Sequence, residues 1–287
     1  MALVEFRLGN SGQYEHNKVQ IAIDRLKMFE PIALELDPEN GYYLCDSGGK
    51  DSSVIKELAM MSGVKFAIHH NHTTLDHPET VYFVRRERAR FQNVGIDYEI
   101  EYPEETFWNL ARKKGMLPLR QARYCCEILK ERGGQDKFCI TGVRWAESVA
   151  RKKNRGIAEV QAKQKDDGII LLNDNDENRK EIETCQRKGK RVVNPIIDWT
   201  DDDVWEFLNT YNVPINPLYE MGYKRVGCML CPFASTKDRE KALNDFPGLK
   251  LRMTHLCRDI LDDRRKKGLS ELKYNTPESY LDHWVKG

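Results

Sequence analysis

One heptapeptide combines the side chains and backbone that a polyphosphate site requires: Ser47-Gly48-Gly49-Lys50-Asp51-Ser52-Ser53. It closely follows the apolar run Tyr42–Cys45, which predicts a buried strand. Two glycines let the backbone turn tightly and approach a ligand without an intervening Cβ. N–H groups at the start of the following helix would then face an anion. The serines add hydroxyl donors, Lys50 a positive charge and Asp51 a carboxylate that could face a metal ion.

The loop is not a Walker loop, because the Gly-x-x-x-x-Gly-Lys-Ser/Thr pattern is absent. A Gly-Gly turn alone is usually an ordinary surface turn, but the strand, turn and helix together favour a ligand site. The segment resembles the PP-loop, Ser-Gly-Gly-x-Asp-Ser, of enzymes that cleave ATP between its α- and β-phosphates. The resemblance implies adenylation, with pyrophosphate held in the loop and AMP passed to an acceptor.

Four of the eight cysteines form two pairs that could converge on one site. Cys125 and Cys126 are adjacent, and Cys228 and Cys231 form a Cys-x-x-Cys about a hundred residues later. Four thiolates hold zinc tetrahedrally or ligate an iron–sulfur cube. Adjacent cysteines suit a cube better, because they can bind different corners of it. The spacing favours a cluster, with structural zinc and unrelated cysteines as the alternatives.

Histidines gather after the second predicted strand. His69, His70 and His72 precede Asp76 in this segment. They could carry protons near neutral pH or, together with the carboxylate, hold a metal ion. The alternative is a polar loop in which Asp76 caps the next helix.

A basic cluster follows the fourth predicted strand, where Arg144 and Arg151 precede Lys152-Lys153 and Arg155. Bidentate arginine suits phosphate or sulfate, although such clusters are often solvated surface. A second basic run, Arg187–Arg191, could contact a nucleic acid backbone. A possible nucleic-acid acceptor is inferred from this run, and an ordinary solvated loop is the alternative.

Several segments together resemble the sulfonucleotide (PAPS/APS) reductase family. The Cys-Cys and Cys-x-x-Cys pairs look like its 4Fe–4S ligand set. The family's other motifs match at three places, which are Thr141–Arg144, Asn194–Trp205 and Asn216–Cys228. The resemblance spans about residues 42–232. It implies a 4Fe–4S cluster on Cys125, Cys126, Cys228 and Cys231, and a nucleotide near His70, Gly142 and Arg144.

Two departures from that family bear on the reaction. Reductases end in a Glu-Cys-Gly-Leu-His-type tail whose cysteine attacks the sulfonucleotide, whereas this sequence ends Ser279–Gly287 without a cysteine. Cys257 is the last cysteine, and its context differs. Reductases also have a degenerate phosphate loop, which is intact here. Both departures favour ATP-using relatives such as the DNA phosphorothioation sulfurtransferase.

Alternating strands and helices must position these residues. Predicted strands lie at 42–45, 66–68, 98–102, 138–141 and 169–172, and predicted helices at 17–29, 53–62, 77–93, 200–212 and from 237 onward. This order indicates an α/β fold, a doubly wound, mostly parallel sheet with helices on both faces, of the adenine nucleotide α-hydrolase-like type. In such sheets, ligands bind beyond the carboxyl ends of the strands.

The expected organisation has three parts. Residues 1–35 are an N-terminal helical segment, 36–235 a PP-loop nucleotide-binding domain with an inserted arm at about 163–191, and 236–287 a helical C-terminal region. Lysine and arginine number 46 against 45 acidic residues, so net charge selects no partner. The sequence shows no signal peptide and no membrane-spanning stretch, which predicts a cytoplasmic protein that does not bind a membrane.

These observations predict an iron–sulfur enzyme with ATP, Mg²⁺ and a 4Fe–4S cluster. The nucleotide would bind at Ser47–Ser53, with its phosphates over Gly48-Gly49 and Mg²⁺ near Asp51. Lys50 and Arg144 would neutralise charge as pyrophosphate leaves. The adenylated acceptor would then receive sulfur, with a cysteine desulfurase or a thioredoxin-like donor as partner. One alternative is a PAPS or APS reductase that releases sulfite. The other is a non-catalytic nucleotide-binding subunit of a complex.

Overall fold

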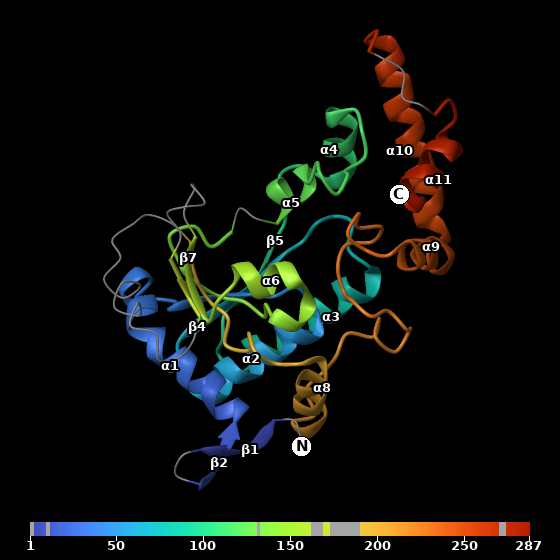
Figure 1. Cartoon of the computed structure of the whole chain (residues 1–287). Coiled ribbons are helices and arrows are strands. Elements are labelled where there is room, and N and C mark those ends of the chain that lie inside the picture. Colours follow the sequence, from blue (N-terminus) through green and yellow to red (C-terminus); the bar gives the residue numbers. More distant parts are fainter. Residues whose placement is uncertain (1–2, 10–11, 131–132, 162–168, 173–189, 270–273) are drawn as a thin grey trace. The chain divides into compact units, whose positions relative to one another are not determined.

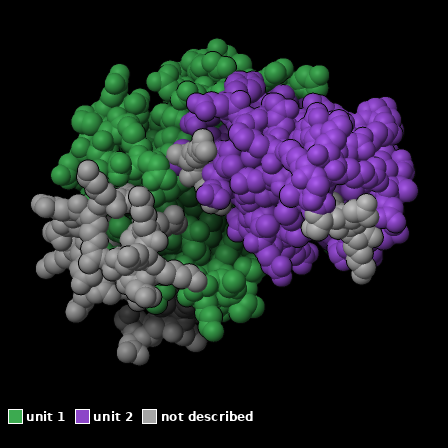
Figure 2. All heavy atoms as spheres, turned by 90° about the horizontal axis from the view of Figure 1, so that it is seen from above, with its two compact units in different colours: residues 1–70, 82–100, 134–226 green, residues 71–81, 101–133, 227–287 purple. Residues whose placement is uncertain are grey.

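The computed structural model describes residues 3–9, 12–130, 133–161, 169–172, 190–269 and 274–287. The chain divides into two compact units. Unit 1 comprises residues 1–70, 82–100 and 134–226, and unit 2 comprises 71–81, 101–133 and 227–287. Figure 2 colours the two units separately. Each unit therefore collects segments that are far apart in the sequence.

A seven-stranded sheet forms the centre of unit 1, in the order β5-β4-β3-β6-β9-β7-β8. Its strands are β3 (Tyr42–Cys45), β4 (Phe66–Asn71), β5 (Tyr98–Glu101), β6 (Phe138–Ile140), β7 (Ala158–Gln161), β8 (Ile169–Leu171) and β9 (Lys190–Val193). Strand β3 pairs in parallel with β4 and β6, and β6 pairs in parallel with β9. The β7 pairings with β8 and β9 are antiparallel. The expected α/β fold with a mostly parallel sheet is confirmed.

The helices of unit 1 follow the strands in the expected alternation. They are α1 (Lys18–Leu36), α2 (Lys50–Ser62), α3 (Pro78–Gln92), the 3-10 turn η1 (Trp145–Glu147), α6 (Val149–Asn154) and α8 (Asp201–Thr210). Helix α1 packs beside α2, and α2 beside α8 (Figure 1). Thr200 caps α8, with its hydroxyl accepting from the Asp203 N–H, as predicted.

The main core lies on the sheet face that carries Tyr42 and Phe138. Phe29 of α1 stacks on Phe138 with ring centroids 5.7 Å apart, and the Tyr42 hydroxyl donates to the Leu26 carbonyl at 2.7 Å. From α3, Phe91 contacts Tyr98 of this face. These side chains are almost fully buried, and each contributes about 1.5–3 kcal/mol by leaving water. Helices α1 and α3 thereby hold the strand ends that precede the loop in place.

The first residues differ from the expected helical segment 1–35. Strands β1 (Val4–Gly9) and β2 (Gly12–Asn17) form an antiparallel hairpin before α1. Helix α1 begins where predicted, because the Asn17 side chain accepts from the Gln20 N–H. The N-terminal region is thus a hairpin followed by a helix.

The expected arm at about 163–191 lies mostly outside the described residues. The structure describes β8, which agrees with the short strand predicted there, and the start of β9. The basic run Arg187–Arg191 is described only at Lys190 and Arg191, which belong to β9. The inferred nucleic-acid contact therefore stays a prediction.

Unit 2 is helical. Its helices are α4 (Phe107–Lys114), α5 (Tyr124–Leu129), α9 (Thr236–Asp245), α10 (Pro247–Lys266) and α11 (Pro277–Lys286). Its core includes Leu117, whose N–H donates to the Tyr280 hydroxyl, and Trp284, whose indole donates to the Pro118 carbonyl. The C-terminal helices thus share one core with the segment before the cysteine pair. Within the described parts of the chain, no helix is both long enough and apolar enough to cross a bilayer.

Candidate functional site

The glycine turn of unit 1 has the predicted strand–turn–helix geometry. Strand β3 ends at Cys45 and α2 begins at Lys50. Gly48 adopts a φ of +70°, which favours glycine, and its N–H donates to the Asp46 carboxylate at 2.8 Å. The Gly48 carbonyl accepts from the Asn216 amide at 3.0 Å. The turn is therefore fixed by side chains on both sides.

Several N–H groups of the turn already have partners in the chain. The Gly49 N–H donates to the Ser52 hydroxyl at 3.1 Å, and the Lys50 N–H donates to the Tyr219 hydroxyl at 2.8 Å. Burial raises the pKa of Tyr219, which keeps the phenol protonated. The Tyr219 ring packs edge-to-face on Trp205 with centroids 5.3 Å apart. A phosphate at the Lys50 N–H would have to replace the Tyr219 hydroxyl.

One polar atom of the loop lacks a partner. Ser53 is 1% exposed, and its Oγ forms no hydrogen bond within the described residues. An unpaired buried hydroxyl costs about 1–3 kcal/mol, so such atoms usually meet water or a ligand. This orphaned hydroxyl at the N-terminus of the 13-residue helix α2 fits an anion site.

The three predicted catalytic side chains meet beside this turn. Arg144 Nε donates to Asp51 Oδ1 at 2.7 Å, and Lys50 Nζ lies 3.1 Å from Asp51 Oδ2. A fourth charged group, Asp201, joins them from the first residue of α8. The chemistry of this donor set fits Mg²⁺, because Asp51 supplies a hard oxygen ligand next to two cations suited to phosphate.

His70 lies on β4 and Gly142 lies just beyond β6, and these two strands pair with β3 on either side. Gly142 follows β6, and a Cβ built there would lie 3.0 Å from the Asp51 carbonyl carbon and oxygen. His70 is buried within β4, which extends to Asn71, beyond the predicted end at Ile68. Its Nδ1 lies 3.0 Å from the Asp46 carbonyl. Both residues therefore support the loop backbone, and their predicted contact with a nucleotide stays a prediction.

A buried charge network underlies the turn. Lys56 Nζ of α2 lies 3.1 Å from Asp46 Oδ2 and 2.8 Å from Glu87 Oε2 of α3, and all three side chains are at most 3% exposed. The Tyr98 hydroxyl also donates to Asp46. Burial alone would raise the pKa of Asp46, but Lys56 and His70 hold it well below its ordinary value. Asp46 is thus a carboxylate that ties the turn to two helices and a strand.

The four predicted cysteine ligands all belong to unit 2 and line one cavity. Cys125 and Cys126 come from α5, and Cys228 and Cys231 from the segment before α9. The remaining lining is mainly apolar: Leu75, Phe107, Pro118, Leu129, Leu230, Pro232 and Trp284. Folding therefore brings together two pairs that are distant in the sequence.

Charged and polar groups surround these thiols. The hydrogen bond from Cys125, with Arg123 and Lys130 nearby, lowers the pKa of Cys126 to about 6, although burial opposes this. Burial raises the pKa of Cys228, which Lys130 and Thr73 partly offset. The Cys228 thiol donates to the Thr73 hydroxyl at 3.3 Å. The hydrogen bond with Cys126 and burial raise the pKa of Cys125, so Cys126 is the cysteine of this pair that ionises first.

Four thiols that line one mainly apolar cavity are a donor set that suits an iron–sulfur cube or a zinc ion. Within the described residues, no three of the four sulfurs lie within 4.8 Å of one another. No disulfide joins the cysteines that the structure describes.

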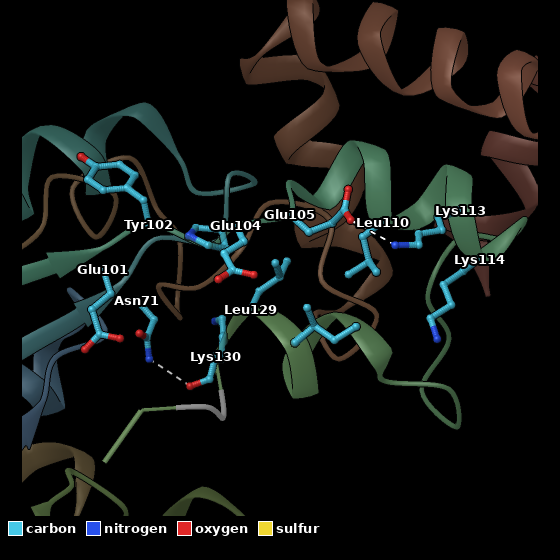
Figure 3. Close-up of a pocket in the computed structure, with 12 residues that line it drawn as sticks. Asn71, Glu101, Tyr102, Glu104, Glu105, Leu110, Lys113, Lys114, Leu129 and Lys130 are labelled. Carbon is cyan, nitrogen blue, oxygen red and sulfur yellow. Dashed lines mark hydrogen bonds and ion pairs between the residues drawn. The ribbon is translucent and has the colours of Figure 1, made fainter. Parts of the chain in front are cut away.

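A larger cavity, of about 630 Å³, adjoins the cysteine cavity in unit 2 and shares Leu129 and Lys130 with it. Figure 3 shows acidic side chains and lysines around it. Lys113 Nζ lies 3.5 Å from Glu105, and the Asn71 amide donates to the Lys130 carbonyl at 2.9 Å. Its volume is that of a small-molecule pocket, and its mixed charge favours a ligand that carries both signs.

Some site residues had weak or no sequence signals. We interpreted Asp201 only as helix-start chemistry, although it lies against Lys50 and Arg144. Tyr219 belongs to a quoted family motif, but its hydrogen bond to Lys50 was not predicted. Lys130, four residues after Cys126, could have been recognised by its spacing, because a helix places such residues on one face.

The sequence profile of the phosphoadenosine phosphosulfate reductase domain matches residues 42–234. An adenosine 5'-phosphosulfate reductase of Allochromatium vinosum is 27% identical over 243 residues, covering 77% of this chain and 82% of that protein. The enzyme of the same name from Oceanobacillus iheyensis is 29% identical over 195 residues, covering 66% and 70%.

An uncharacterized protein of Methanocaldococcus jannaschii is 27% identical over 244 residues, which are 79% of this chain. The match covers only 45% of that longer protein. The domain profile covers well over half of this chain and includes the glycine turn, Arg144 and all four clustered cysteines. The chain therefore belongs to the phosphoadenosine phosphosulfate reductase family.

Proposed function

We propose that this chain is a nucleotide-processing enzyme that adenylates an acceptor with ATP and couples this step to sulfur transfer. The observation that carries the proposal is the complete phosphate loop, with Lys50, Asp51 and Arg144 in mutual contact beside it. An enzyme that binds a sulfonucleotide without cleaving a triphosphate has no need for a pyrophosphate site. The fully formed turn and the orphaned Ser53 hydroxyl support a polyphosphate ligand.

In the first step, an acceptor oxygen attacks the α-phosphorus of ATP, and the bond from that phosphorus to the bridging oxygen breaks. The electron pair leaves with pyrophosphate. Lys50 and Arg144 would neutralise the charge that develops there, an effect typically worth about 2.7–4 kcal/mol per donor. Asp51 would hold Mg²⁺, which would supply further positive charge to the phosphates. In the second step, a sulfur nucleophile at the oxidation level of sulfide attacks the activated atom of the acceptor, and the bond from that atom to the AMP oxygen breaks. AMP leaves with the electron pair, so the step involves no net redox change.

The cysteines Cys125, Cys126, Cys228 and Cys231 would hold a 4Fe–4S cluster. When bound, the cluster would supply an iron–sulfur centre in an apolar cavity. Lys130, whose pKa the neighbouring Cys228 raises, would balance the negative charge of the thiolates. The adjoining cavity, with carboxylates and lysines, is the proposed position of the sulfur donor or acceptor, which carries both charges.

A sulfonucleotide reductase is the second candidate. The similar proteins of Allochromatium vinosum and Oceanobacillus iheyensis are adenosine 5'-phosphosulfate reductases, which favours this reaction. The phosphate loop beside Lys50, Asp51 and Arg144 disfavours it, because a sulfonucleotide has no pyrophosphate leaving group for such a loop to hold.

The reaction products separate the candidates, and nucleotide binding gives a further test. Protein purified under anaerobic conditions should absorb broadly at about 400 nm from its cluster and should release AMP and pyrophosphate from ATP when its acceptor is present. Sulfite release from adenylyl sulfate with thioredoxin, without ATP, would establish the reductase instead. Thermal denaturation offers a test without the acceptor, because the true nucleotide should stabilise the protein more than its rival.

A further inference from the structure

Two acidic side chains already engage the cations that a phosphate would need. Arg144 is 1% exposed, and its guanidinium donates to Asp51 at 2.7 Å, to Asp201 at 2.7 Å and to the Trp199 carbonyl at 3.2 Å. The same Oδ1 atom of Asp201 lies 3.1 Å from Lys50 Nζ. One carboxylate oxygen therefore bridges both proposed phosphate-binding cations.

This bridge is specific to Asp201. Asp202 is the next residue of α8 and carries the same charge at the same helix start. Within the described residues it makes no ion pair with Lys50 or Arg144, and its side chain is exposed. A general preference for acids near a helix N-terminus therefore does not explain the Asp201 contacts.

A metal-free polyphosphate at these cations would approach two carboxylates, and close like charges repel. Hydrogen bonds from Arg144 and Lys50, against the effect of burial, keep the pKa of Asp201 below its ordinary value, so it stays negative. The side chains of Asp51 and Asp201 are 22% and 68% exposed, so a hydrated cation can reach both. A divalent cation would turn this repulsion into attraction.

We propose that Asp201 is a specificity-determining residue, which makes the loop select metal-complexed polyphosphate and exclude the free anion. The inference rests on the proposed function of the loop. Asp201 competes with a free anion for Lys50 and Arg144, whereas it assists a ligand that arrives with a divalent cation. The loop would thus discriminate between forms of one ligand by charge.

The test is calorimetric titration of pyrophosphate into the full chain, once with EDTA and once with excess Mg²⁺. In EDTA, Asp201→Asn should bind about tenfold more tightly than the unsubstituted protein, equivalent to about 1.4 kcal/mol. In Mg²⁺, Asp201→Asn should bind pyrophosphate no more tightly than the unsubstituted protein does. The matched control, Asp202→Asn, should stay within about twofold of the unsubstituted protein in both buffers. Asp201→Ser should behave like Asp201→Asn.

The outcomes separate the inference from the proposed function. If Asp201→Asn and Asp202→Asn change affinity equally, or if neither changes it, the inference is wrong while the loop remains a phosphate site. If the unsubstituted protein fails to bind pyrophosphate even in Mg²⁺, the proposed function itself is wrong. Each variant should fold, because Thr200 and Asp203 still cap α8. Thermal melting checks this.

Discussion

Gly142 shows how strongly the loop depends on the smallest side chain. A Cβ at this position would lie 3.0 Å from the Asp51 backbone, so α2 or the strand end would have to shift. Backbone atoms cannot move aside as a flexible side chain does. The glycine is therefore required for packing rather than for a positive φ.

Gly142→Ala should weaken Mg²⁺–ATP binding about tenfold, because the displaced α2 start no longer presents its N–H groups correctly. Calorimetric titration measures the affinity, and circular dichroism checks the fold. Gly248→Ala is the control, since nothing lies within 4 Å of a Cβ built there. Equal ATP affinity in the two variants would contradict the packing argument.

Lys50→Met should lower kcat for pyrophosphate formation about 100-fold or more, because it removes one charge that stabilises the leaving group. Lys27→Met serves as the control, since Lys27 is exposed on α1. Pyrophosphate release is measured with the acceptor present. A Lys50→Met variant with unchanged kcat would remove Lys50 from the mechanism.

The side chains that carry the proposed chemistry were predictable, because their types are rare in this combination. Lys50, Asp51 and Arg144 were predicted from the sequence and lie together in the structure. Asp201 and Tyr219 were not predicted as partners of the loop, since both residues lie about 150 to 170 positions after it in the sequence. No local sequence pattern predicts such long-range contacts.

At the scale of elements, helices α2 and α3 are joined to the loop by buried charges. Lys56 is the cation between Asp46 and Glu87, and its ammonium also lies 5.6–5.9 Å from the centroids of three aromatic rings. Removing one partner from such a network leaves an uncompensated charge in the core. The network therefore makes the elements interdependent.

Lys56→Met should destabilise the fold by about 3–5 kcal/mol, because Asp46 and Glu87 would lose the buried cation that lies between them. Urea unfolding measures the loss, with Lys27→Met as the matched control. Adding Glu87→Gln to Lys56→Met should recover part of the stability. Additive losses in the double variant would argue against a network.

A single buried histidine gives unit 2 a sensitivity to acid. His77, whose ring lies 5.3 Å from that of Phe246, is 4% exposed, and burial lowers its pKa to about 4. The unfolded chain, with an ordinary histidine pKa of about 6.5, binds a proton more readily between these values. Stability is thus fully present above about pH 6.5 and falls as the pH drops toward 4.

His77→Gln should lose less stability than the unsubstituted protein between pH 6.5 and 4, by up to about 3 kcal/mol. Chemical unfolding at several pH values measures the difference. His255→Gln is the control, since His255 is exposed on α10. If both variants follow the same pH curve, His77 does not cause the sensitivity.

Most of the sheet and its helices could be predicted, because apolar runs and capping residues mark them. The N-terminal hairpin was missed, although the alternation of Val4, Phe6 and Leu8 with charged residues is a strand signal. The apolar run Phe66–Ile68 predicts a strand that ends before His70, whereas β4 continues through His70 to Asn71. Boundaries depend on neighbouring strands, which sequence patterns do not specify.

At the scale of the whole chain, the two proposed chemistries belong to different units. The phosphate loop is in unit 1, whereas all four cysteines that line the apolar cavity are in unit 2. The sequence predicted the four cysteines as one ligand set. It did not predict that each unit is assembled from three separate segments of the chain. Such a division depends on long-range packing.

Loss of a cluster should therefore affect one unit selectively. Cys126→Ser should bind less iron and lose hydrogen-exchange protection in unit 2, while Mg²⁺–ATP still protects the α2 region of unit 1. Cys45→Ser, which alters a cysteine of unit 1, should retain full iron content. Exchange changes spread evenly over both units would contradict this prediction.

The packing of Tyr219 on Trp205 has an optical consequence. The Tyr219 hydroxyl accepts a hydrogen bond from the Lys50 N–H, and the ring of Tyr219 packs edge-to-face on the Trp205 indole with centroids 5.3 Å apart. A ligand that displaces the phenol must alter the surroundings of a fluorophore on α8. Tryptophan emission should therefore follow the filling of the turn in real time, without any added dye.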